Sequence, residues 1–176
     1  MNTPDQSANL PAKCMANLAG RSEVTAIDGS SYAFRTRDVA ERVDRHAEAV
    51  TGTKVLIDMA CQQELSAGRK AQDILAEMET YWSARKAAGY DLVVAVTVPD
   101  ATMFTSAANR ERAALNDMIR WSTVADAVAD IAALAEMQDA TNKTYFGDGI
   151  HITSATTTLI EPVVTAAIEG VLRVTA

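Results

Sequence analysis

Leu92-Val93-Val94-Ala95-Val96-Thr97-Val98, followed by Pro99, is the stretch of sequence that decides the fold. It is continuously apolar and rich in β-branched residues, which is typical of a strand covered on both faces within a parallel sheet. Lys54 to Met59 is a second run of this kind, and Val24 to Ile27 and Ala127 to Ile131 predict two more strands. Because proline cannot donate to a sheet, we expect the central strand to end before Pro99.

Helical patterns separate these strands. They cover Leu10 to Leu18, a segment with Val39, Val43, Ala47 and Val50 on one face, Ser66 to about Gly89, Ala107 to Trp121, and Ser154 to Leu172. Strands that alternate with helices predict a three-layer α/β/α sandwich, a parallel sheet with helices on both faces, in one domain spanning residues 1–176. Ala132 to Gly147 is left as a long loop, and sites in such sheets gather beyond the carboxyl ends of the strands.

The charge balance argues against two classes of partner. The chain has 16 Lys and Arg against 23 Asp and Glu, a net charge of −7, so we expect no nucleic acid and no anionic membrane to bind. No uninterrupted apolar run approaches ~20 residues, and residues 1–5 lack the features of a signal peptide, which favours a soluble, cytoplasmic product. Cys14 and Cys61 lack metal-type spacing and are expected to be buried thiols, so no metal or cofactor is predicted.

The segment Tyr145-Phe146-Gly147-Asp148-Gly149-Ile150-His151-Ile152-Thr153 carries the chemistry. Asp148 stands three residues before His151 at the entrance to the last helix. An imidazole oriented by a carboxylate can accept a proton from a hydroxyl nucleophile, so Asp148 and His151 have the pattern of two members of a catalytic triad. A turn that caps the next helix is the structural alternative.

The order of elements and the Asp-Gly-Ile-His segment together resemble the SGNH (GDSL-type) hydrolase family. Tyr81 to Asp91 leading into Val93 to Pro99 is similar to a helix and strand of that family, and Asn116 lies where an asparagine-containing helix follows. The resemblance covers nearly the whole chain. It implies a flavodoxin-like fold and, in active members, a serine esterase, lipase or carbohydrate deacetylase in which Asp148 orients His151.

The chain departs from this family at its nucleophile and oxyanion blocks. The first strand and its Gly-Asp-Ser block are apparently missing; Asp5-Gln6-Ser7 is the nearest equivalent, and Ser7 could equally cap the first helix. The Gly-x-Asn-Asp block falls on Ala60-Cys61-Gln62-Gln63, where Gln62 would have to donate to the oxyanion and Cys61 is an alternative thiol nucleophile. The family's oxyanion glycine would lie within Asp28-Gly29-Ser30-Ser31, making Gly29 and Ser30 pocket candidates.

Two functions remain open. The first is a non-catalytic structural module whose partners are other protein chains of a larger assembly. Phage capsid decoration and minor tail proteins carry domains of this resemblance. The missing first strand would leave an open sheet edge through which a neighbouring chain could bind. In that case the protein would be associated with a virion, Asp148 would cap the final helix and His151 would pack under it. The alternative is a serine or cysteine esterase or a glycan deacetylase. Either way, we expect the pair beyond the strand ends, near Gln62 and the turn 28–31.

Overall fold

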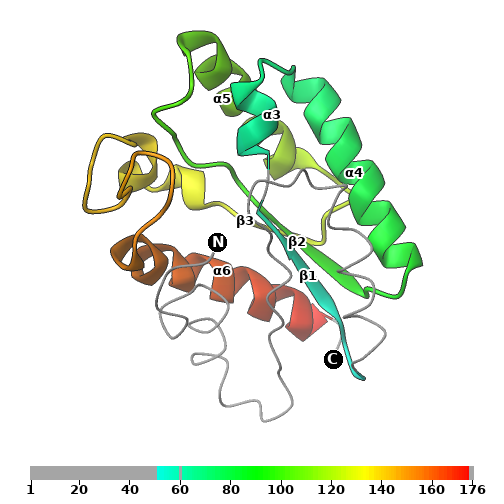
Figure 1. Ribbon diagram of the computed structural model, residues 1–176. Helices are drawn as coiled ribbons and strands as arrows, with labels where there is room; N and C mark the ends of the chain where they lie inside the picture. Colours follow the sequence, from blue (N-terminus) through cyan, green and yellow to red (C-terminus); the bar gives the residue numbers. More distant parts are fainter. Residues whose placement is uncertain (1–50, 60, 175–176) are drawn as a thin grey trace.

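The computed structural model describes residues 51–59 and 61–174, and a three-stranded sheet lies at its centre (Figure 1). The strands are β1 (Val55–Asp58), β2 (Leu92–Val96) and β3 (Ala127–Ala129), in the order β1-β2-β3. Both pairings are parallel. As predicted, β2 is central and every one of its residues is buried. Among the described strands β1 borders only β2, and the predicted strand Val24–Ile27 lies outside the described residues.

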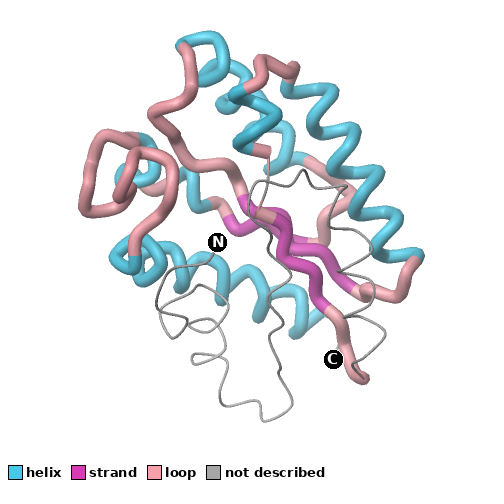
Figure 2. Tube along the Cα trace, viewed as in Figure 1, coloured by secondary structure: helices cyan, strands magenta, loops and turns pink. Residues whose placement is uncertain are grey.

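Helices cover both faces of this sheet, which confirms the predicted three-layer α/β/α architecture (Figure 2). The elements are α3 (Gln62–Ser66), α4 (Ala71–Ala87), α5 (Ser106–Trp121), the 3-10 turns η3 (Ile131–Ala133) and η4 (Ala135–Gln138), and α6 (Ser154–Val174). Side chains of β2 alternate between the layers: Val93 and Ala95 belong to the core under α3, α4 and α5, whereas Val94 and Val96 belong to the core under α6. A strand packed on both sides must be apolar at every position, which explains the continuous run.

The helix α6 forms one outer layer. Its buried positions Ile160, Val164, Ile168 and Val171 recur at helical spacing and pack into the core on that face of the sheet. Ser154–Arg173 is long and apolar enough to cross a membrane by length and composition, with a mean hydropathy of 1.3. Its burial against the sheet is what a core helix of a globular domain requires, so this helix by itself is weak evidence for a membrane span.

The start of α4 differs from the sequence-based expectation. The helix was expected to open at Ser66, but Ser66 is the last residue of the short helix α3 and α4 begins at Ala71. Gly68 lies between them with φ +79°, and the Arg69 amide donates to the Glu64 carbonyl. The left-handed conformation at a glycine ends one helix and redirects the chain into the next.

The segment expected to be a long loop from Ala132 is structured in its first part. Ile131 and Met137 are fully buried and anchor η3 and η4 in the core under α6. The Ala132 amide donates to Thr97 Oγ1 at 2.9 Å, which ties this segment to the end of β2. The prediction of a long loop was therefore wrong for residues 132–138. Ile131 and Met137 are six residues apart, and this spacing shows neither the period of an α-helix nor that of a strand, so the short 3-10 turns left no recognisable pattern in the sequence.

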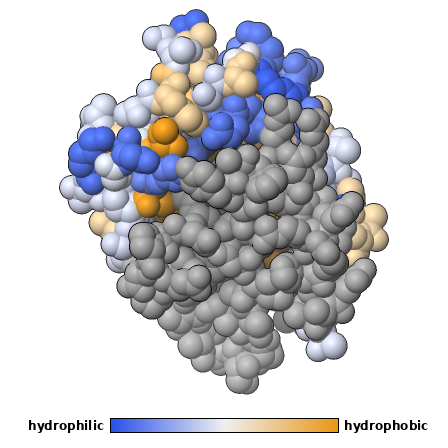
Figure 3. All heavy atoms as spheres, viewed as in Figure 1, coloured by the Kyte–Doolittle hydropathy of each residue, from blue (hydrophilic) through white to orange (hydrophobic). Residues whose placement is uncertain are grey.

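Hydrophilic residues cover much of the described surface on the face shown in Figure 3. Ion pairs also form on the described surface, among them Arg69 with Glu77 and Lys70 with Glu111, each at 2.8 Å. Such exposed pairs stabilise a fold only weakly. Trp121, at the end of α5, is 85% exposed and is the largest apolar side chain on the described surface.

Candidate functional site

Asp148 and His151 form a closely bonded pair. Asp148 Oδ2 lies 2.6 Å from His151 Nδ1, and Asp148 Oδ1 accepts hydrogen bonds from the backbone amides of Ile150 (2.9 Å) and His151 (2.7 Å). Because a carboxylate only accepts, Nδ1 of the imidazole carries a proton, and in the neutral tautomer this puts the lone pair on Nε2. The side chains of Asp148 and His151 are 56% and 51% exposed, so the pair is within reach of a molecule from solution.

These hydrogen bonds also set the charge state of Asp148. The His151 backbone amide, the His151 side chain and the Ile150 amide, in order of importance, hold the pKa of the Asp148 carboxyl well below its usual range. Hydrogen bonds donated to a carboxylate favour its ionised form. Asp148 is therefore a permanent acceptor that orients the imidazole and can stabilise it when it becomes protonated.

A short hairpin presents the pair. Phe146 and Ile152 form an isolated antiparallel bridge at its base, and both side chains are buried in the core under α6. The Gly147 amide donates to the His151 carbonyl at 3.1 Å. At the tip, the Gly149 carbonyl accepts the backbone amide of Thr102 at 2.8 Å. Thr102 follows the end of β2, so the pair lies beyond the carboxyl ends of the strands, where the sequence placed it (Figure 1).

The structural alternative for this motif was wrong on both counts. Asp148 does not cap α6, because its described bonds all remain within residues 148–151. Thr153 does so instead: its Oγ1 accepts the Thr156 amide at 3.3 Å and donates to the Thr144 carbonyl at 2.6 Å. His151 is half exposed and does not pack under the helix.

The candidates for the oxyanion region lie after β1. Cys61 is buried, with 5% of its surface exposed, and it adopts a left-handed backbone with φ 82° just before α3. Gln62 is the first residue of α3 and is half-buried. The structure thus places both residues beyond the carboxyl end of the strand that neighbours β2. Ser7, Gly29 and Ser30 lie outside the described residues, as does Cys14.

A second carboxylate stands at the end of β1 in the opposite kind of environment. Asp58 is buried and accepts a hydrogen bond from Trp82 Nε1 at 2.7 Å. Burial raises its pKa to about 6; the indole hydrogen bond opposes this shift and the nearby Glu64 carboxylate adds to it. From the sequence alone, a carboxylate at the end of an apolar run, as at Asp58, could be an acid of a site or simply the first polar residue past the sheet. Asp58 is the last residue of the strand and belongs to the core beneath α4.

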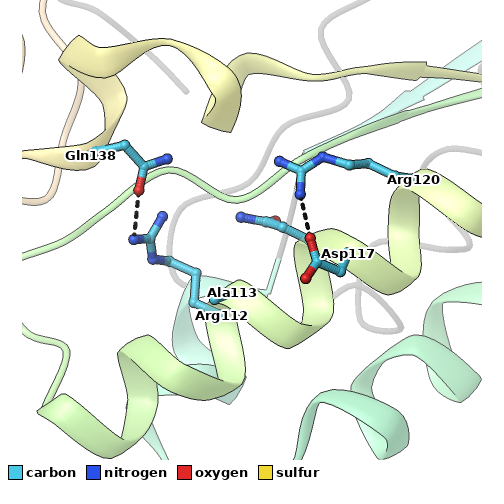
Figure 4. A pocket seen from close by; sticks show the side chains of 6 residues that line it. Arg112, Ala113, Asp117, Arg120 and Gln138 are labelled. Carbon is cyan, nitrogen blue, oxygen red and sulfur yellow. Dashed lines mark hydrogen bonds and ion pairs between the residues drawn. The ribbon is translucent and has the colours of Figure 1, made fainter.

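A shallow cavity of about 130 Å³ lies beside α5 (Figure 4). Arg112 donates to Gln138 Oε1 (3.1 Å) and to the Val98 carbonyl, and Arg120 is bonded to Asp117 and Asp130. The polar groups that line the cavity thus bond one another and the backbone. These bonds attach α5 to the segment that contains η4. The polar groups are used in these bonds and do not point together into the cavity, as the groups that bind a ligand would.

Sequence reasoning missed Thr102 and the Asp58–Trp82 bond. Neither has a local signal, because the partners are 47 and 24 residues apart in the chain. Among the described residues no group of three His, Cys, Asp or Glu side chains could hold a metal ion.

No protein-family model matches the chain, and no curated protein matches it either.

Proposed function

We propose that the chain hydrolyses an ester bond, with His151 as general base and Asp148 as the residue that orients it. The observation that carries this proposal is the 2.6 Å contact between Asp148 Oδ2 and His151 Nδ1, with the carboxylate held by two backbone amides. A carboxylate fixed in this way orients the imidazole and selects the tautomer in which Nε2, and not Nδ1, can accept a proton. The exposure of both side chains supports a role that requires access to a substrate.

The start of α6 and the anchoring of the hairpin in the core do not depend on Asp148 or His151, which supports the same proposal. Thr153 caps α6, and Phe146 and Ile152 anchor the hairpin in the core. Helix formation and packing therefore do not require a histidine at position 151 or an aspartate at position 148. An exposed histidine held against an ionised carboxylate is the arrangement that proton transfer needs.

The reaction requires a nucleophile whose proton His151 accepts. The nucleophile attacks the ester carbonyl carbon, the leaving alcohol takes the proton from the imidazole, and a water molecule then releases the acid by the reverse steps. Ser7 and Cys61 are the two candidates in the chain. Cys61 is buried and Ser7 lies outside the described residues. Substitution of each residue in turn decides which of them is the nucleophile.

An assay with a chromogenic acetyl ester and an acetylated oligosaccharide tests the proposal. We expect turnover above background in the unaltered chain, and a loss of about 10³-fold or more in kcat for His151→Ala and Asp148→Asn, as for other triads. Loss in Ser7→Ala identifies a serine hydrolase, and loss in Cys61→Ala identifies the thiol. Turnover that survives His151→Ala would refute the assignment.

A non-catalytic module of a larger assembly is the second candidate. The observation that favours it is Gln62 at the first position of α3, where active members of the SGNH family have an asparagine that helps to bind the oxyanion. The additional methylene displaces the amide from a position that must lie within about 2.7–3.1 Å of the oxyanion. No turnover on either substrate, together with a particle size that grows with concentration, would support this candidate instead.

A further inference from the structure

We propose that Thr102 is a positioning residue for the Asp148–His151 pair and that it acts through the carbonyl of Gly149. Thr102 donates twice to this single oxygen, from its backbone amide at 2.8 Å and from Oγ1 at 3.2 Å. Its use in catalysis rests on the proposed function, but its effect on the geometry of the pair does not. Thr102 touches neither reacting group, so it acts only through the hairpin.

The planar peptide bond transmits this contact to the carboxylate. The carbonyl of Gly149 and the amide of Ile150 belong to one peptide unit, whose atoms lie close to one plane. Thr102 holds the carbonyl end of that unit, and the amide end donates to Asp148 Oδ1 at 2.9 Å. A rotation that releases the Gly149 carbonyl must therefore turn the Ile150 amide away from the carboxylate.

The backbone at Gly149 makes this arrangement specific. Gly149 has φ +89°, a region that residues with a side chain rarely adopt. A Cβ placed on Gly149 would overlap the Thr102 side chain, coming within 2.7 Å of its Cγ2. The hairpin tip thus approaches Thr102 as closely as only glycine permits, and the two residues form one contact unit.

Thr102 is itself held rigidly. It lies in the turn between Ala101 and Phe104, closed by a hydrogen bond from the Phe104 amide to the Ala101 carbonyl at 3.0 Å. Both of these side chains are buried in the core under α4 and α5, whereas the base of the hairpin is buried in the core under α6. Thr102 therefore connects the two layers at the end of the sheet. Through this connection it fixes the position of the Asp148–His151 pair relative to β2.

The test replaces the hydroxyl while keeping the shape. Thr102→Val removes the Oγ1 donor and retains the backbone amide, and Thr102→Ser is the matched control that retains the hydroxyl. The first readout is the titration of the Asp148 carboxyl by carbon NMR in the full chain, because the Ile150 amide that Thr102 supports is one of the donors that hold its pKa low, after the backbone amide and the side chain of His151. We expect Thr102→Val to raise that pKa by about half a unit and Thr102→Ser to leave it within a few tenths, consistent with one weakened hydrogen bond.

A second variant and a kinetic readout complete the test. Gly149→Ala should raise the Asp148 pKa further than Thr102→Val and weaken the downfield proton signal of the Asp148–His151 bond. If the chain hydrolyses esters, Thr102→Val should lower kcat with KM unchanged. A shifted Asp148 pKa without ester turnover in the unaltered chain would uphold the positioning role and refute the hydrolase. An Asp148 pKa that is the same in Thr102→Val and the unaltered chain would overturn the positioning role, whatever the activity.

Discussion

Two aspartates show how neighbours set the chemistry of the same side chain. Asp148 is exposed, accepts three hydrogen bonds and has its pKa held low, whereas Asp58 is buried, accepts one from Trp82 and has its pKa raised to about 6. Hydrogen bonds donated to a carboxylate favour the ionised form, and removal from water disfavours it. Only Asp148 has the environment of a catalytic orienting residue. Asp58 is a buried acid that the proposed reaction does not use.

The raised pKa of Asp58 makes stability depend on pH. Its ordinary value is 3.8 and its folded value about 6, so the folded protein binds the proton more tightly than the unfolded chain. Folding is therefore favoured when the carboxyl is protonated, and stability falls as pH rises through 6. Asp58→Asn keeps an acceptor for the Trp82 indole and should raise the free energy of unfolding at about pH 8 by on the order of 2–3 kcal/mol.

Urea unfolding at about pH 4 and about pH 8 measures this effect. At the lower pH the gain should nearly vanish, because the folded protein then carries a protonated Asp58. Gln72→Ala, at an exposed uncharged position in the first turn of α4, is the control and should have the same effect at both pH values. An equal effect of Asp58→Asn at both pH values would show that burial does not govern this carboxyl.

At the scale of elements, Asn116 fastens α5 to the end of β2. Its Oδ1 accepts the Val98 amide at 2.7 Å and its Nδ2 donates to the Val98 carbonyl at 2.9 Å. Asn116 is 3% exposed, so neither backbone group can turn to water instead. A single amide side chain thus satisfies both backbone groups at the point where the central strand ends.

Asn116→Ala should therefore destabilise the fold more than loss of its side-chain contacts alone. It leaves the buried Val98 amide without its acceptor, at a cost of about 1–3 kcal/mol, whereas the Val98 carbonyl keeps the hydrogen bond from Arg112 at 3.3 Å. Ala113→Ser, at an exposed position of the same helix, should change stability by less than about 0.5 kcal/mol. Urea denaturation of the three proteins measures the difference, and equal midpoints would contradict the role given to Asn116.

Thr153 should be required for the start of α6. Thr153→Ala removes the side-chain acceptor for the Thr156 amide and the donor to the Thr144 carbonyl. We expect a loss of about 1–2 kcal/mol, and Thr153→Ser, which keeps the hydroxyl, should lie close to the unaltered chain. Thermal unfolding followed by circular dichroism measures both variants. A Thr153→Ser variant as unstable as Thr153→Ala would mean that the methyl group, and not the cap, matters.

At the scale of the whole molecule, two hydrophobic cores share one sheet. β2 contributes Val93 and Ala95 to the core under α4 and α5, and Val94 and Val96 to the core under α6. Loss of either helical layer would expose one face of the same strand to water. The described part of the chain should therefore unfold as a single cooperative unit.

The two tryptophans of the chain allow this to be tested. Trp82, a residue of α4, is fully buried and Trp121 is exposed, so in a Trp121→Phe background the fluorescence reports only the layer of α4 and α5. Ile160→Ala, in the opposite core, should shift the Trp82 transition as far as it shifts the far-UV signal, at a cost of about 2–5 kcal/mol. Leu115→Ala, in the α4 layer, is the matched variant. A Trp82 midpoint unmoved by Ile160→Ala would show two independent units.

Much of the fold follows from local sequence pattern. The run from Leu92 is apolar at every position because both faces of β2 are buried, and the helices α5 and α6 begin within a residue or so of the expected positions. The pairing of Asp148 with His151 was also predictable, because they are three positions apart and one turn brings them together. In each case the information lies within a few residues, where chain geometry leaves few alternatives.

The sequence by itself thus determined the parallel α/β layering and the acid–base pair, whereas the tertiary structure decided what surrounds that pair. Thr102 and Gly149 are 47 residues apart, and Asp58 and Trp82 are 24 apart. Their contacts exist only because β1 and β2 end side by side and the hairpin before α6 folds over the end of the sheet. Periodicity records which face of an element is buried, but it does not record which polar atom will meet another once the layers have packed.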